Sequence, residues 1–197
     1  MNNDKRVIKG KETSSTIIES AIDIISESGI DGVSAGNIAR RAGISKSSIF
    51  HHFSSVDDIR LKVLNTITER MLGIMQNEAI SSIDEFLDII EAMLFNNDQE
   101  YQKTSRVFFA FYHASLFSKS YAEVFNNFLN QTIKELEAIL KNLDIKPSYT
   151  IDTARLIIAT LDGLSIQINI TKDTKTYYAS WISIKHIAKK YLKETQK

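Results

Sequence analysis

The chain has 197 residues, and its 43% hydrophobic content can fill a buried core in one large or two small domains. It contains no cysteine, which excludes disulfides, thiolate metal ligands and thiol catalysis. Its 24 basic and 24 acidic residues balance, so net charge alone indicates no polyanionic partner. Only one proline and seven glycines are present, and this composition favours an all-α fold over a loop-rich β fold.

The termini and hydropathy predict where the protein acts. No apolar run reaches the length of a membrane span, and residues 1–11 lack the apolar segment of a signal peptide. A cytoplasmic protein without membrane contact is therefore expected. The same N-terminal arm carries Lys5, Arg6, Lys9 and Lys11, which either follow a nucleic-acid backbone or belong to a solvated tail.

Apolar periodicity predicts one helix after another, separated by short polar breaks. The first helix is expected at about 14–28, with Ile22 and Ile25 on its apolar face and Gly29 at its end. Two short helices within 34–53 and a long helix from a Ser55–Asp58 capping box to about 75 follow; later helices are expected at 82–96, 101–117, 119–142, 149–170 and 174–193. The sequence thus predicts about nine helices, with Pro147 in the break before the eighth.

Residues 34–53 carry the most specific pattern of the chain. Ser34 suits the N-cap of a short helix, and Gly43 supplies the left-handed residue that ends it. Ser45 then caps a second helix, whose Ile49 turns inward against the first. The polar side chains left facing outward are those of Lys46, Ser47, Ser48, His51 and His52. A helix with short hydrogen-bonding side chains and a cation at its N-terminal end has the chemistry needed to enter the major groove of DNA.

The local charge of this segment fits contact with phosphate, although the whole chain is neutral. No Asp or Glu occurs between Gly32 and Val56, whereas Arg40, Arg41 and Lys46 are basic. Such a placement of cations supports non-specific attraction to a nucleic-acid backbone.

Residues 14–64 resemble the DNA-binding domain of the tetracycline-repressor (TetR) family of bacterial transcription regulators. The resemblance rests on an apolar helix ending in ESGIDGVS, followed by NIARRAGISKSSIFHHF and then by SSVDDI. It implies an N-terminal arm and helix-turn-helix domain at 1–55 and a helical regulatory and dimerisation domain at 56–197. It also implies a homodimer that binds a palindromic operator in double-stranded DNA and is released by a small molecule.

The family's DNA contacts carry over to a set of polar and backbone positions in this chain. These positions are Ser34, Ala35, Gly36, Ser45, Lys46, Ser47, Ser48, Phe50, His51 and His52. Gly36 is expected to contribute backbone amides and no base contact, and Phe50 lacks the hydroxyl of the usual tyrosine and is expected to pack instead. Val56 stands where a lysine is common. Each departure should weaken non-specific affinity more than base choice.

Metal, cofactor and catalytic sites are not expected. His51 and His52 are adjacent, do not share a helical face and have no carboxylate or thiolate near them in sequence. His113 and His186 are isolated. The chain has no HExxH motif, phosphate-binding glycine loop or nucleophile elbow, so it is predicted not to be an enzyme.

The segment RVFFAFYHASLF at 106–117 is apolar almost all round, which predicts burial on most sides. It is either plain core or the wall of a ligand cavity, because hydrogen-bonding side chains interrupt the aromatic ones. The residues expected to line such a cavity are Met71, Met75, Phe86, Ile90, Phe108, Phe111, Tyr112, His113 and Ser115. The inducer would then be largely apolar.

The last two expected helices carry more apolar surface than a monomer requires, which indicates a homodimer. Gly163 costs about 1 kcal/mol relative to alanine inside a helix, which is tolerable where a second backbone approaches. The DGL at 162–164 also resembles a short family signature near the dimer contact. The expected interface residues are Ala154, Ile158, Leu161, Gly163, Trp181 and Ile184. The alternative is a pair of core helices in a monomer.

Three functional hypotheses follow from the sequence. The first is a homodimeric repressor that a small, largely apolar ligand releases from its operator. The second is a constitutive DNA-binding regulator whose C-terminal half binds a protein partner or no ligand. The third, an all-α enzyme that carries the helix-turn-helix motif, has no catalytic motif to support it.

Overall fold

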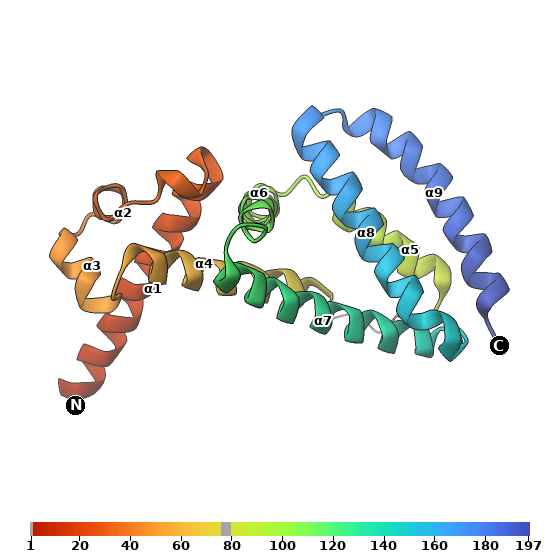
Figure 1. The fold of residues 1–197 in the computed structure, drawn as a ribbon, viewed down its shortest axis with the longest axis horizontal. Helices are drawn as coiled ribbons and strands as arrows, with labels where there is room; N and C mark the ends of the chain where they lie inside the picture. The colour runs from red at the N-terminus through yellow and green to blue at the C-terminus, as the bar shows by residue number, and fades with distance from the viewer. Residues whose placement is uncertain (1, 76–79) are drawn as a thin grey trace. The chain divides into compact units, whose positions relative to one another are not determined.

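The computed structural model describes residues 2–75 and 80–197, and for residues 2–9 and 74–75 it describes the backbone alone. Within these ranges the chain contains nine α-helices, one short 3-10 helix and no β-strand (Figure 1). The helices are α1 (Asn2–Ser28), η1 (Ile30–Gly32), α2 (Ala35–Ala42), α3 (Lys46–His52), α4 (Val56–Met75), α5 (Ile83–Leu94), α6 (Gln99–Ala114), α7 (Lys119–Asn142), α8 (Pro147–Thr171) and α9 (Thr174–Thr195). The predicted all-α class is confirmed. None of the helices in the described ranges is long and apolar enough to cross a lipid bilayer.

The chain packs into two compact units, each built from two stretches of sequence. The first unit contains residues 1–71 and 99–126, and the second contains residues 72–98 and 127–197. The sequence-based division at residue 55 separates two expected functions, and it stays a prediction.

The first unit is organised around α1, which packs against α2, α3 and α6. Its core contains fully buried side chains from five helices. They are Ile17 and Ile22 of α1, Ile38 of α2, Ile49 of α3, Ile59 and Leu64 of α4, and Phe111 of α6. Because α1 packs against these three helices, it holds the short α2 and α3 in place.

Two helix boundaries in this unit differ from the predicted ones. Helix α1 begins at Asn2 and not near Ser14, because the intervening residues include no proline and a single glycine, Gly10, to interrupt the helix. Helix α6 ends at Ala114, whereas the sequence predicted a helix to residue 117 with burial on most sides. Leu116 and Phe117 are instead 73% and 81% exposed. Their amide groups donate to carbonyl oxygens three residues earlier, a tight turn that takes both side chains away from the core.

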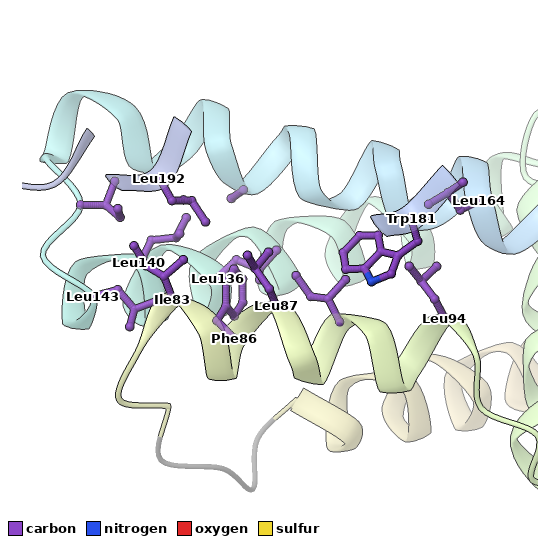
Figure 2. Packing of buried hydrophobic residues seen from close by; sticks show 13 residues of the cluster. Ile83, Phe86, Leu87, Leu94, Leu136, Leu140, Leu143, Leu164, Trp181 and Leu192 are labelled. Carbon is purple, nitrogen blue, oxygen red and sulfur yellow. The ribbon is translucent and has the colours of Figure 1, made fainter. Parts of the chain in front are cut away.

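The second unit packs α5 against both α8 and α9. Figure 2 shows Phe86 and Leu87 of α5 among apolar side chains from the neighbouring helices, with Trp181 of α9 in the same core. Helix α8 begins at Pro147, which the sequence placed in the preceding break. Proline suits the first turn of a helix, because the amide hydrogen that it lacks has no partner within the helix there.

Charged groups add long-range links between α5 and α9. The Lys185 ammonium lies 2.6 Å from a carboxylate oxygen of Asp88 and 2.6 Å from one of Glu91. The Trp181 indole donates a 2.8 Å hydrogen bond to Glu91 Oε2, the same carboxylate oxygen that Lys185 contacts. The hydrogen bond from Lys185, with smaller contributions from Trp181 and Tyr178, lowers the pKa of Glu91. These contacts orient α9 on α5.

Candidate nucleic-acid interface

Local hydrogen bonds set the start and end of α2. Ser34 is its N-cap, and the Ser34 hydroxyl accepts a 3.1 Å hydrogen bond from the Asn37 amide. The Asn37 side chain donates in turn to the Gly32 carbonyl oxygen at 2.8 Å. Gly43 ends the helix at φ 66°, a left-handed conformation that glycine adopts without a Cβ penalty. The predicted caps at both ends of this helix are confirmed.

Helix α3 follows directly and is capped by Ser45. Its hydroxyl accepts from the Ser48 amide at 3.1 Å and lies 2.8 Å and 2.9 Å from the hydroxyls of Ser47 and Ser48. Ile49 is fully buried, which anchors one face of α3 on the first unit. The opposite face therefore points to solvent with its hydrogen-bonding groups.

The polar residues predicted to meet DNA lie at the start of α2 and along α3, where His51 and His52 belong to the last turn. Lys46, Ser47, His51 and His52 are exposed, and Ser48 is half-buried. Within the described ranges no three histidine or carboxylate side chains gather as metal ligands. The exposed set is therefore a polar surface of hydroxyl, imidazole and ammonium groups.

Lys46 has a neighbour that the sequence did not reveal. Its Cε lies 3.3 Å from the position that a Cβ on Gly36 would occupy, and its Nζ lies 3.6 Å from that position. Gly36 therefore leaves room for the lysine side chain to lie across the start of α2. A larger residue at position 36 would displace the end of this side chain.

The packing expected of Phe50 is wrong. Its side chain is 52% exposed, because it follows the buried Ile49 by one residue and so points about 100° away around the helix. An exposed aromatic ring on α3 adds apolar surface to a face that is otherwise polar.

Helix α4 starts at Val56, which is half-buried. The predicted capping box is present, but the carboxylate of the box bonds an amide one residue earlier than expected. The Ser55 hydroxyl accepts from the Asp58 amide at 3.0 Å, as expected. The Asp58 carboxylate reaches back to the Ser54 amide, also at 3.0 Å, and not to that of Ser55.

The basic residues of this region differ in whether a carboxylate of the same chain already pairs with them. Arg41 was counted from sequence as a cation facing phosphate, but its guanidinium donates to the Glu27 carboxylate at 2.7 Å. That hydrogen bond lowers the pKa of Glu27. Arg60 likewise pairs with Asp57 at 2.8 Å. Arg40 and Lys46 are exposed, so these two cations are the candidates for contact with phosphate.

The residues predicted to bind a ligand do not line one shared cavity within either unit. Phe86 and Ile90 line an apolar groove of 340 Å³ in the second unit. The other predicted residues with described side chains, all outside this groove, are Met71, Phe108, Phe111, Tyr112, His113 and Ser115, which belong to the first unit. The Met75 side chain lies outside the described residues.

Several of these first-unit residues lie in the core or at the surface of that unit and not on the wall of the groove. Phe108 and Phe111 are buried in the first unit. The ring centroids of Phe108 and Phe125 lie 5.3 Å apart there, in an edge-to-face arrangement. His113 is exposed, and the Ser115 hydroxyl donates to the Tyr112 carbonyl oxygen at 2.7 Å.

The residues predicted to form a dimer interface are divided between core and surface. Ala154 and Trp181 are buried within the chain itself, at 0% and 2% exposure, so a second subunit has no direct access to them. Ile158, Leu161, Gly163 and Ile184 are half-buried. The exposed apolar side chains of these two helices are instead Leu156, Ile166, Ile170, Tyr178, Ile182 and Ile187, with Ile151 and Tyr149 near the start of α8.

Helices α2 and α3, with the left-handed turn between them and an exposed polar face on α3, define a helix-turn-helix DNA-binding protein. Residues 17–63 match the family model for bacterial regulatory proteins of the tetR family. This segment therefore has the DNA-binding domain of the TetR family of transcriptional regulators.

Relatives extend the likeness beyond this segment. The chain is 26% identical over 160 residues to the HTH-type transcriptional regulator PksA of Bacillus subtilis, a match that covers 76% of this chain and 75% of PksA. It is 30% identical over 88 residues to IcaR of Staphylococcus aureus, the negative regulator of the biofilm operon icaADBC. That match covers 43% of this chain and 47% of IcaR, about half its length. These relatives are transcriptional regulators and not enzymes.

Solved structures share the same fold. A transcriptional regulator from Rhodococcus sp. Rha1 superposes with a TM-score of 0.76 at 26% identity, covering 87% of this chain and 92% of the other. GusR of Salmonella enterica gives a TM-score of 0.72 at 18% identity, with coverage of 91% and 96%.

Proposed function

We propose that this protein is a homodimeric repressor that binds a palindromic operator in the cytoplasm and leaves it when a small, largely apolar ligand binds. The exposed polar face of α3, held by a fully buried Ile49, is the observation that carries the proposal. IcaR, a negative regulator by name, supports repression over activation.

Within this proposal the DNA contacts are those that the sequence indicated. Hydroxyl groups of Ser47 and Ser48 exchange their bonds with Ser45 for bonds to base edges or phosphates, and Lys46 supplies the cation. The half-buried backbone at Ala35 and Gly36 contributes amides at the start of α2. One recognition helix reads too few base pairs for a specific site, so two subunits are required.

The surface proposed to join the two subunits lies on α8 and α9. We define the proposed dimer interface as the exposed apolar residues Leu156, Ile166, Ile170, Ile182 and Ile187 together with Gly163. A Cβ on Gly163 would meet nothing within 4 Å of its own chain, which leaves space for a partner helix. Dimerisation about a two-fold axis would place the two recognition helices about 34–36 Å apart on successive turns of DNA.

Ligand release is supported by structural neighbours that were solved with small molecules. EbrR, described as a multidrug binding protein, was crystallised with malachite green, and a regulator from Saccharomonospora viridis with choline. Both share the fold at 19% and 18% identity.

Selection of bound sequences from a random DNA library tests the DNA-binding and dimer parts of the proposal. The purified chain should enrich a palindrome whose half-sites are centred about one helical turn apart, at a stoichiometry of two chains per site or a multiple of two. Enrichment of an asymmetric site by a single chain would contradict the homodimer, and retention of no DNA at low salt would contradict the DNA-binding role. Bound complexes that no apolar or cationic compound releases would favour the constitutive regulator.

A further inference from the structure

The loop that leads into α2 is held by side chains from two different helices. Asn37 of α2 donates to the Gly32 carbonyl oxygen at 2.8 Å. Arg60 of α4 donates from one terminal nitrogen of its guanidinium to the next carbonyl oxygen, that of Val33, at 3.0 Å. Ser34, the N-cap of α2, follows Val33 directly. The second contact therefore ties the start of α4 to the start of α2.

Arg60 reaches this carbonyl oxygen in a fixed orientation. Its other terminal nitrogen donates to the Asp57 carboxylate at 2.8 Å, and its Nε is buried without a hydrogen-bond partner. The side chain as a whole is 23% exposed. A planar guanidinium bonds two acceptors at once, which a single ammonium group does not do in the same geometry. Turning the guanidinium out to solvent would break both hydrogen bonds, so the side chain is held against the loop.

The same guanidinium acts on Tyr121, near the start of α7. Burial raises the pKa of the Tyr121 hydroxyl, and the positive charge of Arg60 lowers it. Tyr121 in turn packs edge to face on the fully buried Phe111, with the ring centroids 5.2 Å apart. The charge of Arg60 is thus engaged by groups of its own unit, whereas Lys46 on α3 is exposed.

The segment that Arg60 holds contains some of the predicted DNA contacts. They are the Ser34 hydroxyl and the backbone amides of Ala35 and Gly36 at the start of α2. Helix α2 has eight residues, and so short a helix depends on tertiary contacts for its position. A binding site needs its groups within about 0.5 Å of the productive geometry. A contact that fixes the first residues of α2 therefore bears on recognition.

We infer that Arg60 is a positioning residue for DNA recognition, whose bond to the Val33 carbonyl oxygen sets where the start of α2 lies, while the arginine itself does not contact the operator. The inference rests on the DNA-binding repressor proposed above. Attraction to random DNA depends on charge and tolerates small displacements, whereas an operator requires α2 and α3 in register with its base pairs. Loss of the Val33 contact should therefore lower operator affinity relative to random-DNA affinity.

Arg60→Lys and Asp57→Asn form the matched pair of variants. Arg60→Lys keeps the charge but loses the paired donors, so the ratio of operator to random-DNA affinity should fall roughly three- to tenfold. Asp57→Asn leaves the Val33 contact in place and removes an 82% exposed carboxylate, so this ratio should stay within about twofold of the wild type. Fluorescence anisotropy measures both affinities, with the palindrome selected from the random library and a scrambled duplex of equal length.

Salt dependence distinguishes positioning from a direct phosphate contact. Arg60→Gln removes the charge, and the salt slope of DNA binding should stay unchanged because Arg60 does not meet phosphate. A slope reduced by about one would assign a phosphate contact to Arg60 and overturn the inference. Thermal unfolding of all four proteins separates positioning from a loss of stability. The affinity ratio of Arg60→Lys should remain lowered at a temperature where every protein is folded.

Amide hydrogen exchange of the full-length protein gives a readout that needs no DNA. The amides of Val33, Asn37 and Ile38 form hydrogen bonds within this segment. Their exchange should be roughly three- to tenfold faster in Arg60→Lys and unchanged in Asp57→Asn. Unchanged exchange in Arg60→Lys, or an unchanged affinity ratio, overturns the inference. A wild-type protein that retains no DNA contradicts the proposed function, and the exchange result then still decides whether Arg60 holds the start of α2.

Discussion

The outer face of α3 and the groove between α8 and α9 are both open to solvent, and their chemistry is opposite. The α3 face presents hydroxyl, imidazole and ammonium groups, while the groove presents almost only hydrocarbon. Contact with a polyanion weakens steeply as salt rises, because counterions are released on binding. Burial of apolar surface has no such dependence. The two surfaces therefore suit different partners, and salt concentration distinguishes them experimentally.

The two regions also differ in what holds them in place. Capping contacts three residues apart, such as Ser45 to the Ser48 amide, set the ends of the short helices in the first unit. The groove depends on contacts between residues about ninety positions apart, such as Glu91 with Trp181 and Lys185. A change in the α5–α9 contacts should thus alter the second unit and leave the recognition helix intact.

The largest expected effect concerns the proposed dimer interface. Ile170→Lys places a charge in a contact that a two-fold axis repeats, so about 2 kcal/mol lost at each copy gives roughly 10³-fold weaker dimerisation. Sedimentation velocity should show monomers, and specific DNA binding should fall with dimerisation. Leu116→Lys is the control, because Leu116 is 73% exposed against 74% for Ile170 but lies on the first unit. A dimeric Ile170→Lys protein with normal binding would place the interface elsewhere.

The next effect concerns the exposed cation of α3. Lys46→Ala should weaken operator binding by about 1–3 kcal/mol if the lysine reads a guanine, or reduce the salt slope by about one if it meets phosphate. Fluorescence anisotropy across a salt series measures both quantities. Lys134→Ala, an exposed lysine on α7 in the second unit, should change neither. If Lys46→Ala also changes neither, α3 does not dock as proposed.

A smaller effect is expected at the link between α5 and α9. The pKa of Glu91 is lowered from its usual 4.5, so its ionised form stabilises the fold above that value and the contribution is lost as pH falls through the lowered pKa. Glu91→Gln should cost about 1 kcal/mol of unfolding free energy at pH 7, a modest figure because the cluster is partly exposed. Urea unfolding should show this difference shrinking below about pH 4.5. A constant difference down to pH 3 would exclude ionisation as its source.

The smallest effect is expected at the start of α4. Val56→Lys adds a cation at the first residue of the helix, beside the α3 surface in sequence. If phosphate lies there, affinity for random DNA at low salt should rise and the salt slope should steepen by up to about one counterion. Val56→Gln is the uncharged control. Equal affinity for all three proteins would show that residue 56 does not meet the backbone.

Local chemistry explains why so much of the first unit was predictable from the chain. Ser34, Gly43 and Ser45 act on amides and dihedral angles within a few residues, so their roles in ending and starting α2 and α3 are written in short segments. The same locality accounts for most helix positions along the chain. Local sequence did not predict the correct boundary at the start of α1 or at the end of α6, where continuing the helix and ending it were equally compatible with the neighbouring residues.

Only the tertiary structure decided which groups remain available for binding. Arg41 looked like a free cation until the fold brought Glu27 to it, and Trp181 and Ala154 looked like interface residues until the second unit buried them. Phe86 and Ile90 were expected beside Phe108, yet the groove joins them to residues of α8 and α9. The sequence by itself determined the helices and the polar face of α3, because caps and apolar periodicity act over one or two turns. Burial, ion pairing and the groove depend on residues far apart in the chain, whose approach is set by the packing of whole helices.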